Sequence, residues 1–142
     1  MLQKPSYLAC PYTHHSAEVM RIRYRAMMAA TALYFREKQI LPLSPINMLH
    51  EVHNQYQLSD NSMDYWAFNR SLLLLCSELV VFAFPGWERS TGVAYELGVA
   101  ETFRIKTKVV DEHDLPKLFA VYDRDYQDTL EWRDLIAAYS CE

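Results

Sequence analysis

The sequence predicts a single α/β domain over residues 1–142, a flavodoxin- or Rossmann-like three-layer sandwich with a central parallel sheet of four or five strands. Three observations predict this class. Short apolar segments alternate with longer segments of helical periodicity. One apolar run, Leu79–Phe84, is continuous and rich in β-branched and aromatic residues, as is typical of a strand buried on both faces. Hydrophobic residues make up 51% of the chain, enough for one core, and no repeat or linker divides it.

The first part of the chain predicts two strands separated by a long helix. A short apolar run that ends before Pro11 fits a buried strand at Ser6–Cys10. Apolar residues then recur at spacings of three and four over Ser16–Lys38, where Ser16 is the candidate N-cap of a helix. Ile40–Leu43 fits a second strand, which ends in a turn at Ser44-Pro45. The polar segment Pro45–Asn61 shows no clear period, and we expect it to be a loop that covers the active site.

The remaining elements follow the same alternation of helices and strands. We expect helices at Ser62–Cys76, Thr91–Arg104 and Thr129–Tyr139, and strands at Leu79–Phe84, Lys108–Val110 and, as the candidate fifth, Leu118–Val121. Right-handed crossovers between such strands produce a parallel sheet, and ligands bind at the carboxyl ends of its strands, where the strand order reverses. Three segments should therefore meet at the site: Pro11–His15, the region after Pro45, and Pro85–Gly92.

Charge and cysteine content exclude several classes of function. The net charge of −4 argues against a nucleic-acid polymer as partner, but leaves room for a single nucleotide. The three cysteines are far apart and show no metal-ligand spacing, as expected for reduced thiols in the cytoplasm. No segment reads as a signal peptide or membrane span. We therefore expect a soluble cytoplasmic protein with a small-molecule partner, no membrane association, no metal and no cofactor.

The most informative segment is Gly86–Gly98, where a central strand gives way to a helix. The free N–H groups and positive end of such a helix attract an anion, and Ser90 and Thr91 add hydroxyl donors. Gly92 lets a ligand approach the backbone, and Glu96 lies one turn further along the same helical face. The alternative interpretation is that Ser90 or Thr91 merely caps the helix and that Glu96 is solvated.

Two motifs together resemble a known enzyme family. Tyr7-Leu8-Ala9-Cys10-Pro11-Tyr12, taken with Ser90-x-Gly92-x-x-x-Glu96-Leu97-Gly98-x-Ala100, is similar to the nucleoside 2-deoxyribosyltransferase superfamily, above all to its small bacterial and phage members. The resemblance covers roughly Ser6–Val110. It implies an enzyme, a hydrolase or a transferase, that cleaves the N-glycosidic bond of a nucleoside or nucleotide.

The resemblance also implies roles for individual residues. Glu96 would attack the anomeric carbon, Tyr7 would orient Glu96, and Ser90 and Gly92 would hold the sugar or a 5′-phosphate. Asp64 is a weaker match to an acidic residue that serves the base or sugar. The remaining substrate-binding candidates lie in the converging segments or near them: Pro11, Tyr12, Arg21, Gly86, Trp87 and Thr91.

The sequence departs from the family pattern at two places. Cys10 stands where many members have glycine, and the helix-opening loop lacks the frequent aspartate, with Ser90 or Thr91 in its place. Because an acidic residue there would repel a phosphate, its absence favours a 5′-monophosphate over the free nucleoside. The resemblance further implies a homodimer or higher homo-oligomer.

Other conspicuous residues are expected to be structural. His50 and His53 are one residue too close for the zinc motif HExxH, and we expect them in a polar loop. Arg21, Arg23 and Arg25 read as a solvated helix face, with Arg21 nearest the predicted site. Trp87 is a candidate to stack on a base. Two alternatives to the leading function stay open: cleavage of NAD at its nicotinamide bond, and a nucleotide-binding or sensor module without turnover.

Overall fold

Four parallel strands form the centre of the fold. A computed structural model describes residues 3–56, 65–111 and 114. The strands are β1 (Ser6–Ala9), β2 (Pro42–Leu43), β3 (Glu78–Phe82) and β4 (Lys106–Val110), and their order in the sheet is β2-β1-β3-β4. All three neighbouring pairs are parallel. This confirms the predicted α/β class with a parallel, Rossmann-like sheet.

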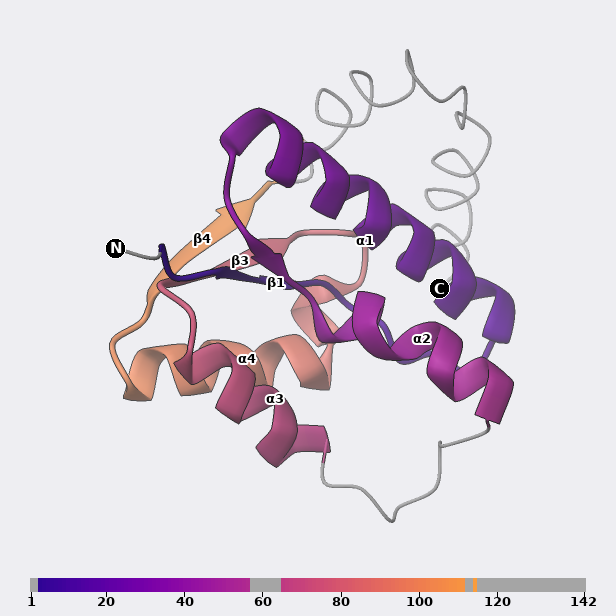
Figure 1. Ribbon diagram of the computed structural model, residues 1–142. Coiled ribbons are helices and arrows are strands. Elements are labelled where there is room, and N and C mark those ends of the chain that lie inside the picture. The colour runs from indigo at the N-terminus through magenta and orange to yellow at the C-terminus, as the bar shows by residue number, and fades with distance from the viewer. Residues whose placement is uncertain (1–2, 57–64, 112–113, 115–142) are drawn as a thin grey trace.

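Helices cover both faces of this sheet. Figure 1 shows α1 (Ala17–Lys38) on one side of the sheet and α3 (Tyr65–Leu74) and α4 (Thr91–Thr102) on the other, and α2 (Pro45–Tyr56) packs beside α1. The 3-10 helix η1 (Trp87–Arg89) leads into α4. The chain moves outward from β1 to β2 and later from β3 to β4, in opposite directions, so the strand order reverses between β1 and β3. That reversal is the expected ligand position in such a sheet.

The two faces of the sheet bury separate clusters of side chains. On the side of α1, Leu8 and Phe82 pack with Met27. On the side of α4, Tyr7 and Val81 pack with Val93. Neighbouring strand residues point to opposite faces, so Leu8 faces α1 while Tyr7 faces α4. The pleat of β1 therefore turns the Tyr7 side chain toward α4.

The segment Pro45–Tyr56 after β2 is a helix, so our expectation of an irregular loop at Pro45–Asn61 is wrong for it, and residues 57–61 lie outside the described residues. The N–H of Asn47 donates to the Ser44 hydroxyl (3.3 Å), and the N–H of Met48 donates to the Ser44 carbonyl (3.1 Å). Ser44 is thus an N-cap, and Pro45 occupies the first helical position, where its missing N–H costs nothing. We read this Ser-Pro pair as a turn, although it is equally typical of a helix start.

The other elements agree with the sequence to within a few residues. Strands β3 and β4 begin one and two residues earlier than expected, and α4 ends two residues earlier. The described part of the predicted helix Ser62–Cys76 is α3. The predicted strand Leu118–Val121 and helix Thr129–Tyr139 lie outside the described residues. No helix in the described residues is both long and apolar enough to cross a membrane.

Candidate active site

Glu96 lies on the side of α4 that faces the sheet. Val93, three residues before it, and Ala100, four residues after it, are both buried, so helical spacing turns Glu96 toward the same side. Its side chain is partly buried. Burial raises the pKa of the Glu96 carboxyl to about 7, because the charged form loses hydration, while the interaction with Tyr7 pulls this pKa down. Near neutral pH the carboxyl is therefore poised between its two protonation states.

Tyr7 approaches Glu96 from the central strand β1. Its ring is fully buried, and its pKa is raised, first by burial and then by the charge and hydrogen-bonding of Glu96. The two groups are thus close enough to influence each other's protonation. No described residue, however, forms a hydrogen bond of ordinary length with the Tyr7 hydroxyl. The site therefore holds a buried hydroxyl with hydrogen-bonding capacity to spare, next to a carboxyl that titrates near pH 7.

Cys10 connects this pair to the loop that follows β1. Its thiol is buried, and its pKa is raised by that burial and by the charge of Glu96, while Arg23 lowers it. The end of β1, the carboxyl of Glu96 and the guanidinium of Arg23 therefore lie within electrostatic reach of one another. Cys10 directly follows β1, one of the two strands between which the strand order reverses.

The N-terminus of α4 forms the next part of the site. The Ser90 hydroxyl caps the helix by accepting the N–H of Val93 (3.2 Å), and the Ser90 carbonyl accepts the N–H of Ala94 (3.0 Å). The N–H groups of Thr91 and Gly92 lie in the first turn of α4. No earlier carbonyl of the helix can accept them, so they point out of its end. Among the described residues, a Cβ added at Gly92 would meet only the Ser90 hydroxyl oxygen, at 3.8 Å. A ligand can therefore reach the first turn of α4.

Gly86 makes the turn that leads to this helix end. Its φ of 92° lies in the left-handed region, which a residue without a Cβ adopts at little cost. Trp87 follows and packs, half-buried, against the core cluster on the α4 side. Trp87 thus contacts the core from within the site loop; whether it also stacks on a base stays a prediction.

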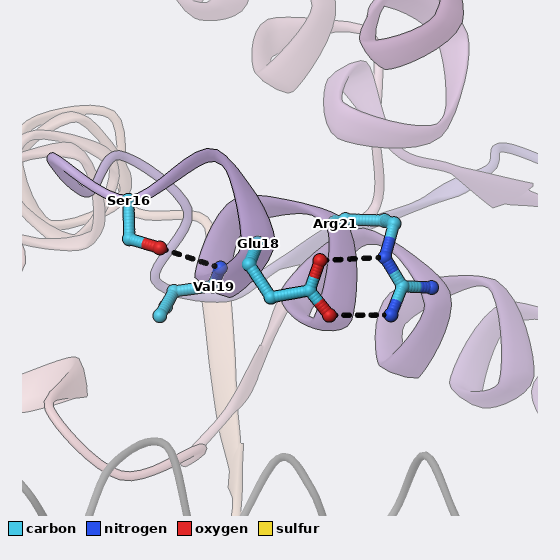
Figure 2. A network of polar contacts seen from close by, with 4 residues as sticks. All are labelled: Ser16, Glu18, Val19 and Arg21. Atoms are coloured by element: carbon cyan, nitrogen blue, oxygen red, sulfur yellow. Dashed lines mark hydrogen bonds and ion pairs between the residues drawn. The ribbon is translucent and has the colours of Figure 1, made fainter.

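One sequence-predicted residue, Arg21, forms an exposed ion pair with Glu18 at the start of α1. Figure 2 shows Arg21 on the first turns of α1, where its guanidinium forms two hydrogen bonds with Glu18, at 2.7 and 3.2 Å. This exposed pair lies beside the N-cap that Ser16 provides to Val19. Asp64 lies outside the described residues. Pro11 and Tyr12 follow β1 directly, as expected, with Pro11 buried and Tyr12 half-buried.

Sequence reasoning missed two buried polar residues beside Tyr12. Arg23 is only 4% exposed, so our interpretation of the three arginines as one solvated face is wrong for it. Its guanidinium donates to the carbonyls of Tyr12 (3.3 Å) and Thr13 (3.1 Å). Helical spacing could have revealed this, because Arg23 lies three and seven residues before the buried Ala26 and Ala30. His50, expected in a polar loop, is buried in α2.

The described residues offer no assembled metal site. Within residues 3–56, 65–111 and 114, no three His, Cys, Asp or Glu side chains gather as ligands would. Cys10 and Cys76 are buried free thiols. Among the described residues, the chemical groups of the site are a carboxyl, a phenol, a thiol, a guanidinium and an open helix end.

Comparison with known proteins places this site inside a family. No curated protein matches the chain. A family model described as "Domain of unknown function (DUF1937)" matches residues 4–112, a stretch that includes all four strands of the sheet, the loop after β1 and the whole of α4 with Glu96. Since the match spans more than half of the 142 residues, the chain belongs to the DUF1937 family.

Proposed function

We propose that this protein cleaves the N-glycosidic bond of a small nucleotide or nucleoside, with Glu96 as the nucleophile. The observation that carries the proposal is the pairing of the half-buried Glu96 carboxyl, whose pKa is about 7, with the buried hydroxyl of Tyr7 at the reversal of strand order. Perturbed carboxyls at such positions are typical of catalytic groups. The resemblance of the two motifs to nucleoside 2-deoxyribosyltransferases supports the same assignment.

The chemistry requires one ionised carboxylate close to an anomeric carbon. A Glu96 oxygen attacks C1′, the bond from C1′ to the base nitrogen breaks, and its electron pair leaves with the base. Water, or another base in a transferase, then attacks C1′ and releases the Glu96 carboxylate. Tyr7 donates a hydrogen bond that holds the carboxylate in its attacking position. The spare bonding capacity of the Tyr7 hydroxyl suits this role.

The open end of α4 favours a 5′-monophosphate over a free nucleoside. Two outward N–H groups, two hydroxyl groups and the positive end of a 12-residue helix converge there. Gly92 and Glu96 are four residues apart, which is about 6 Å along the helix axis. That spacing is comparable to the span of one pentose. A phosphate at Thr91 and Gly92 would therefore bring C1′ toward Glu96.

The direct test is base release from a panel of nucleosides, nucleoside 5′-monophosphates and NAD, followed by chromatography. We expect wild type to release a base from at least one monophosphate, and Glu96→Gln to lower that rate roughly 10³-fold or more while keeping the shape of the side chain. Glu101→Gln is the matched control, because Glu101 is an exposed glutamate on the same helix. Near-normal base release by Glu96→Gln would remove Glu96 from the mechanism.

The same panel distinguishes the two alternative functions. Release of nicotinamide from NAD, without base release from any other compound of the panel, would show that the substrate is a dinucleotide. Saturable binding of a monophosphate without any base release would instead indicate a sensor module.

A further inference from the structure

A buried histidine on α2 lies against the loop that follows β1. His50 is 3% exposed, and both of its ring nitrogens are engaged. Nδ1 is hydrogen-bonded to the hydroxyl of Tyr12, and Nε2 lies 3.0 Å from the side-chain amide nitrogen of Asn54. The ring of Tyr24 stacks on the imidazole at 4.1 Å between centroids, with 16° between the planes. Nothing in the assigned chemistry of Glu96 and Tyr7 uses this cluster.

The partners of His50 determine where its proton lies. Burial lowers the pKa of His50, so the imidazole is neutral at physiological pH and carries one N–H. The amide nitrogen of Asn54 can only donate, so Nε2 must accept and must lack a proton. The proton is therefore on Nδ1, and Nδ1–H donates to the oxygen of Tyr12. The hydroxyl hydrogen of Tyr12 is then not needed by His50 and remains available to another acceptor.

Tyr12 stands in the loop after β1 and is held there from two sides. Its carbonyl accepts a hydrogen bond from the buried guanidinium of Arg23, and its hydroxyl is fixed by His50. Tyr12 follows Cys10 by two residues, and the buried Cys10 thiol is close enough to Glu96 for the charge of that carboxylate to raise its pKa further. Tyr12 is itself half-buried, so part of its side chain is exposed.

We propose that His50 is a positioning residue that makes the Tyr12 hydroxyl a hydrogen-bond donor to the departing base. The inference rests on the proposed N-glycosidic cleavage. When the bond from C1′ to the base breaks, the electron pair gives the base a developing negative charge on its ring nitrogens and carbonyl oxygens. The Tyr12 O–H donates to one of these atoms and stabilises that charge, without transferring its proton. The base takes up a proton from water after it leaves.

Reversing the polarity of the cluster tests this assignment. In Asn54→Asp, a carboxylate replaces the donor at Nε2, so the neutral imidazole moves its proton to Nε2 and its Nδ1 accepts the hydroxyl hydrogen of Tyr12. Tyr12 then loses its donor capacity while every ring stays in place. Asn54 is exposed, so the fold tolerates the change. Gln55→Glu, at the adjacent exposed position, is the matched control for added negative charge.

The kinetic readout uses two leaving groups. One is the nucleoside 5′-monophosphate that wild type cleaves best, and the other is a 4-nitrophenyl glycoside of the same sugar phosphate, whose phenolate leaves without help. Asn54→Asp should slow base release about tenfold or more and leave nitrophenolate release within about twofold. Gln55→Glu should change neither. Equal losses on both substrates would overturn the role in leaving-group stabilisation, because a merely structural defect affects both.

A second measurement is independent of turnover. The ¹⁵N chemical shifts of the His50 ring report its tautomer directly, and at about pH 8.5, well above the usual histidine pKa, the ring is neutral. We expect the Nδ1–H form in wild type and the Nε2–H form in Asn54→Asp. An Nε2–H form in wild type would overturn the inference whatever the kinetics. A wild type that cleaves nothing in the panel would overturn the proposed function. The tautomer would then still show whether Nδ1 of His50 donates to the Tyr12 hydroxyl or accepts from it.

Discussion

The protonation state of Glu96 connects its burial to the rate of the proposed reaction. Only the carboxylate can attack C1′, and the pKa of Glu96 is about 7 because burial penalises the charge. We therefore predict that kcat/KM rises with pH through a single ionisation near pH 7 and levels off above it. Rates of base release between pH 5 and 9 measure this profile. A rate that falls across the same interval would mean that the protonated acid is the active form, and that Glu96 is no nucleophile.

Tyr7→Phe separates the catalytic from the structural value of one hydroxyl. The Tyr7 hydroxyl is buried without an ordinary hydrogen bond to any described residue, so at pH 5, where Glu96 is protonated, its removal should leave stability unchanged or slightly higher. Catalysis should fall by a factor equivalent to about 1–3 kcal/mol, since one orienting hydrogen bond is lost. Tyr7 also lowers the pKa of Glu96, so the midpoint of the pH–rate profile should move to higher pH. An unmoved midpoint with unchanged rate would show that the two groups do not cooperate.

Sequence reasoning reached the pairing of these two residues only through the family resemblance. Tyr7 and Glu96 are far apart in the chain, and their meeting depends on the order β2-β1-β3-β4, which places β1 beside β3. Spacing alone located Glu96 on the face of Gly92, which is a local fact of the helix. The roles of Arg23 and His50 depend on how α1 and α2 pack over the loop after β1. That packing is a tertiary property, which local patterns indicate only weakly.

At the scale of elements, the signals for helix ends limited how well the secondary structure could be predicted from the sequence. The continuous run in β3 and the period of α1 each have one physical explanation, and both were located to within a few residues. Ser44-Pro45 has two possible explanations, because serine and proline are common at the starts of both turns and helices. Because we predicted a loop in place of α2, we also did not predict that His50 is buried. A loop has no helical periodicity that would indicate a buried face.

Ser90 has an observed role as the cap of α4 and a proposed role in phosphate binding, and substitution at Ser90 can separate the two. Ser90→Ala removes both the cap and a hydroxyl donor, and should cost about 1 kcal/mol of stability. Ser90→Asp retains a good cap for the Val93 N–H but places a negative charge where the phosphate would bind. We predict that Ser90→Asp raises KM for the monophosphate about tenfold or more, while the melting temperature and the kinetics on the free nucleoside change little.

Comparison of the two substrates makes this prediction decisive. If Ser90→Asp impaired the nucleoside and the monophosphate equally, the helix end would bind the sugar rather than the phosphate. Equal efficiency of wild type on both substrates would remove the phosphate preference without any variant.

At the scale of the whole molecule, we predict a homodimer or higher homo-oligomer. The family resemblance supports assembly, and large apolar side chains remain exposed on the helices that cover the sheet, among them Phe35 on α1 and Tyr56 on α2, which are 60% and 71% exposed. Light scattering of the full chain at micromolar concentration should give at least twice the monomer mass. A clean monomer with full activity would contradict this prediction.

The free energy of unfolding should also depend on pH through the ionisation of Glu96. In the folded protein its pKa is about 7, against an ordinary value of 4.5, so the folded state holds this proton more tightly than the unfolded state does. Stability from this group is therefore complete below about pH 4.5, falls as pH rises toward 7, and stays low above it. The loss amounts to about 3 kcal/mol at most, from the size of the shift. This is the cost of keeping a carboxylate partly out of water.

Glu96→Gln removes that cost together with the reaction. Its stability relative to wild type, measured by urea unfolding, should be close at pH 4.5 and should exceed wild type increasingly up to pH 7, because glutamine never ionises. Taking the difference between the two proteins cancels every other titrating group. Glu101→Gln should show no such trend, as its carboxyl is exposed on the same helix. A difference that stays flat with pH would mean that Glu96 is solvated, and the case for a perturbed catalytic carboxyl would fail on equilibrium measurements alone.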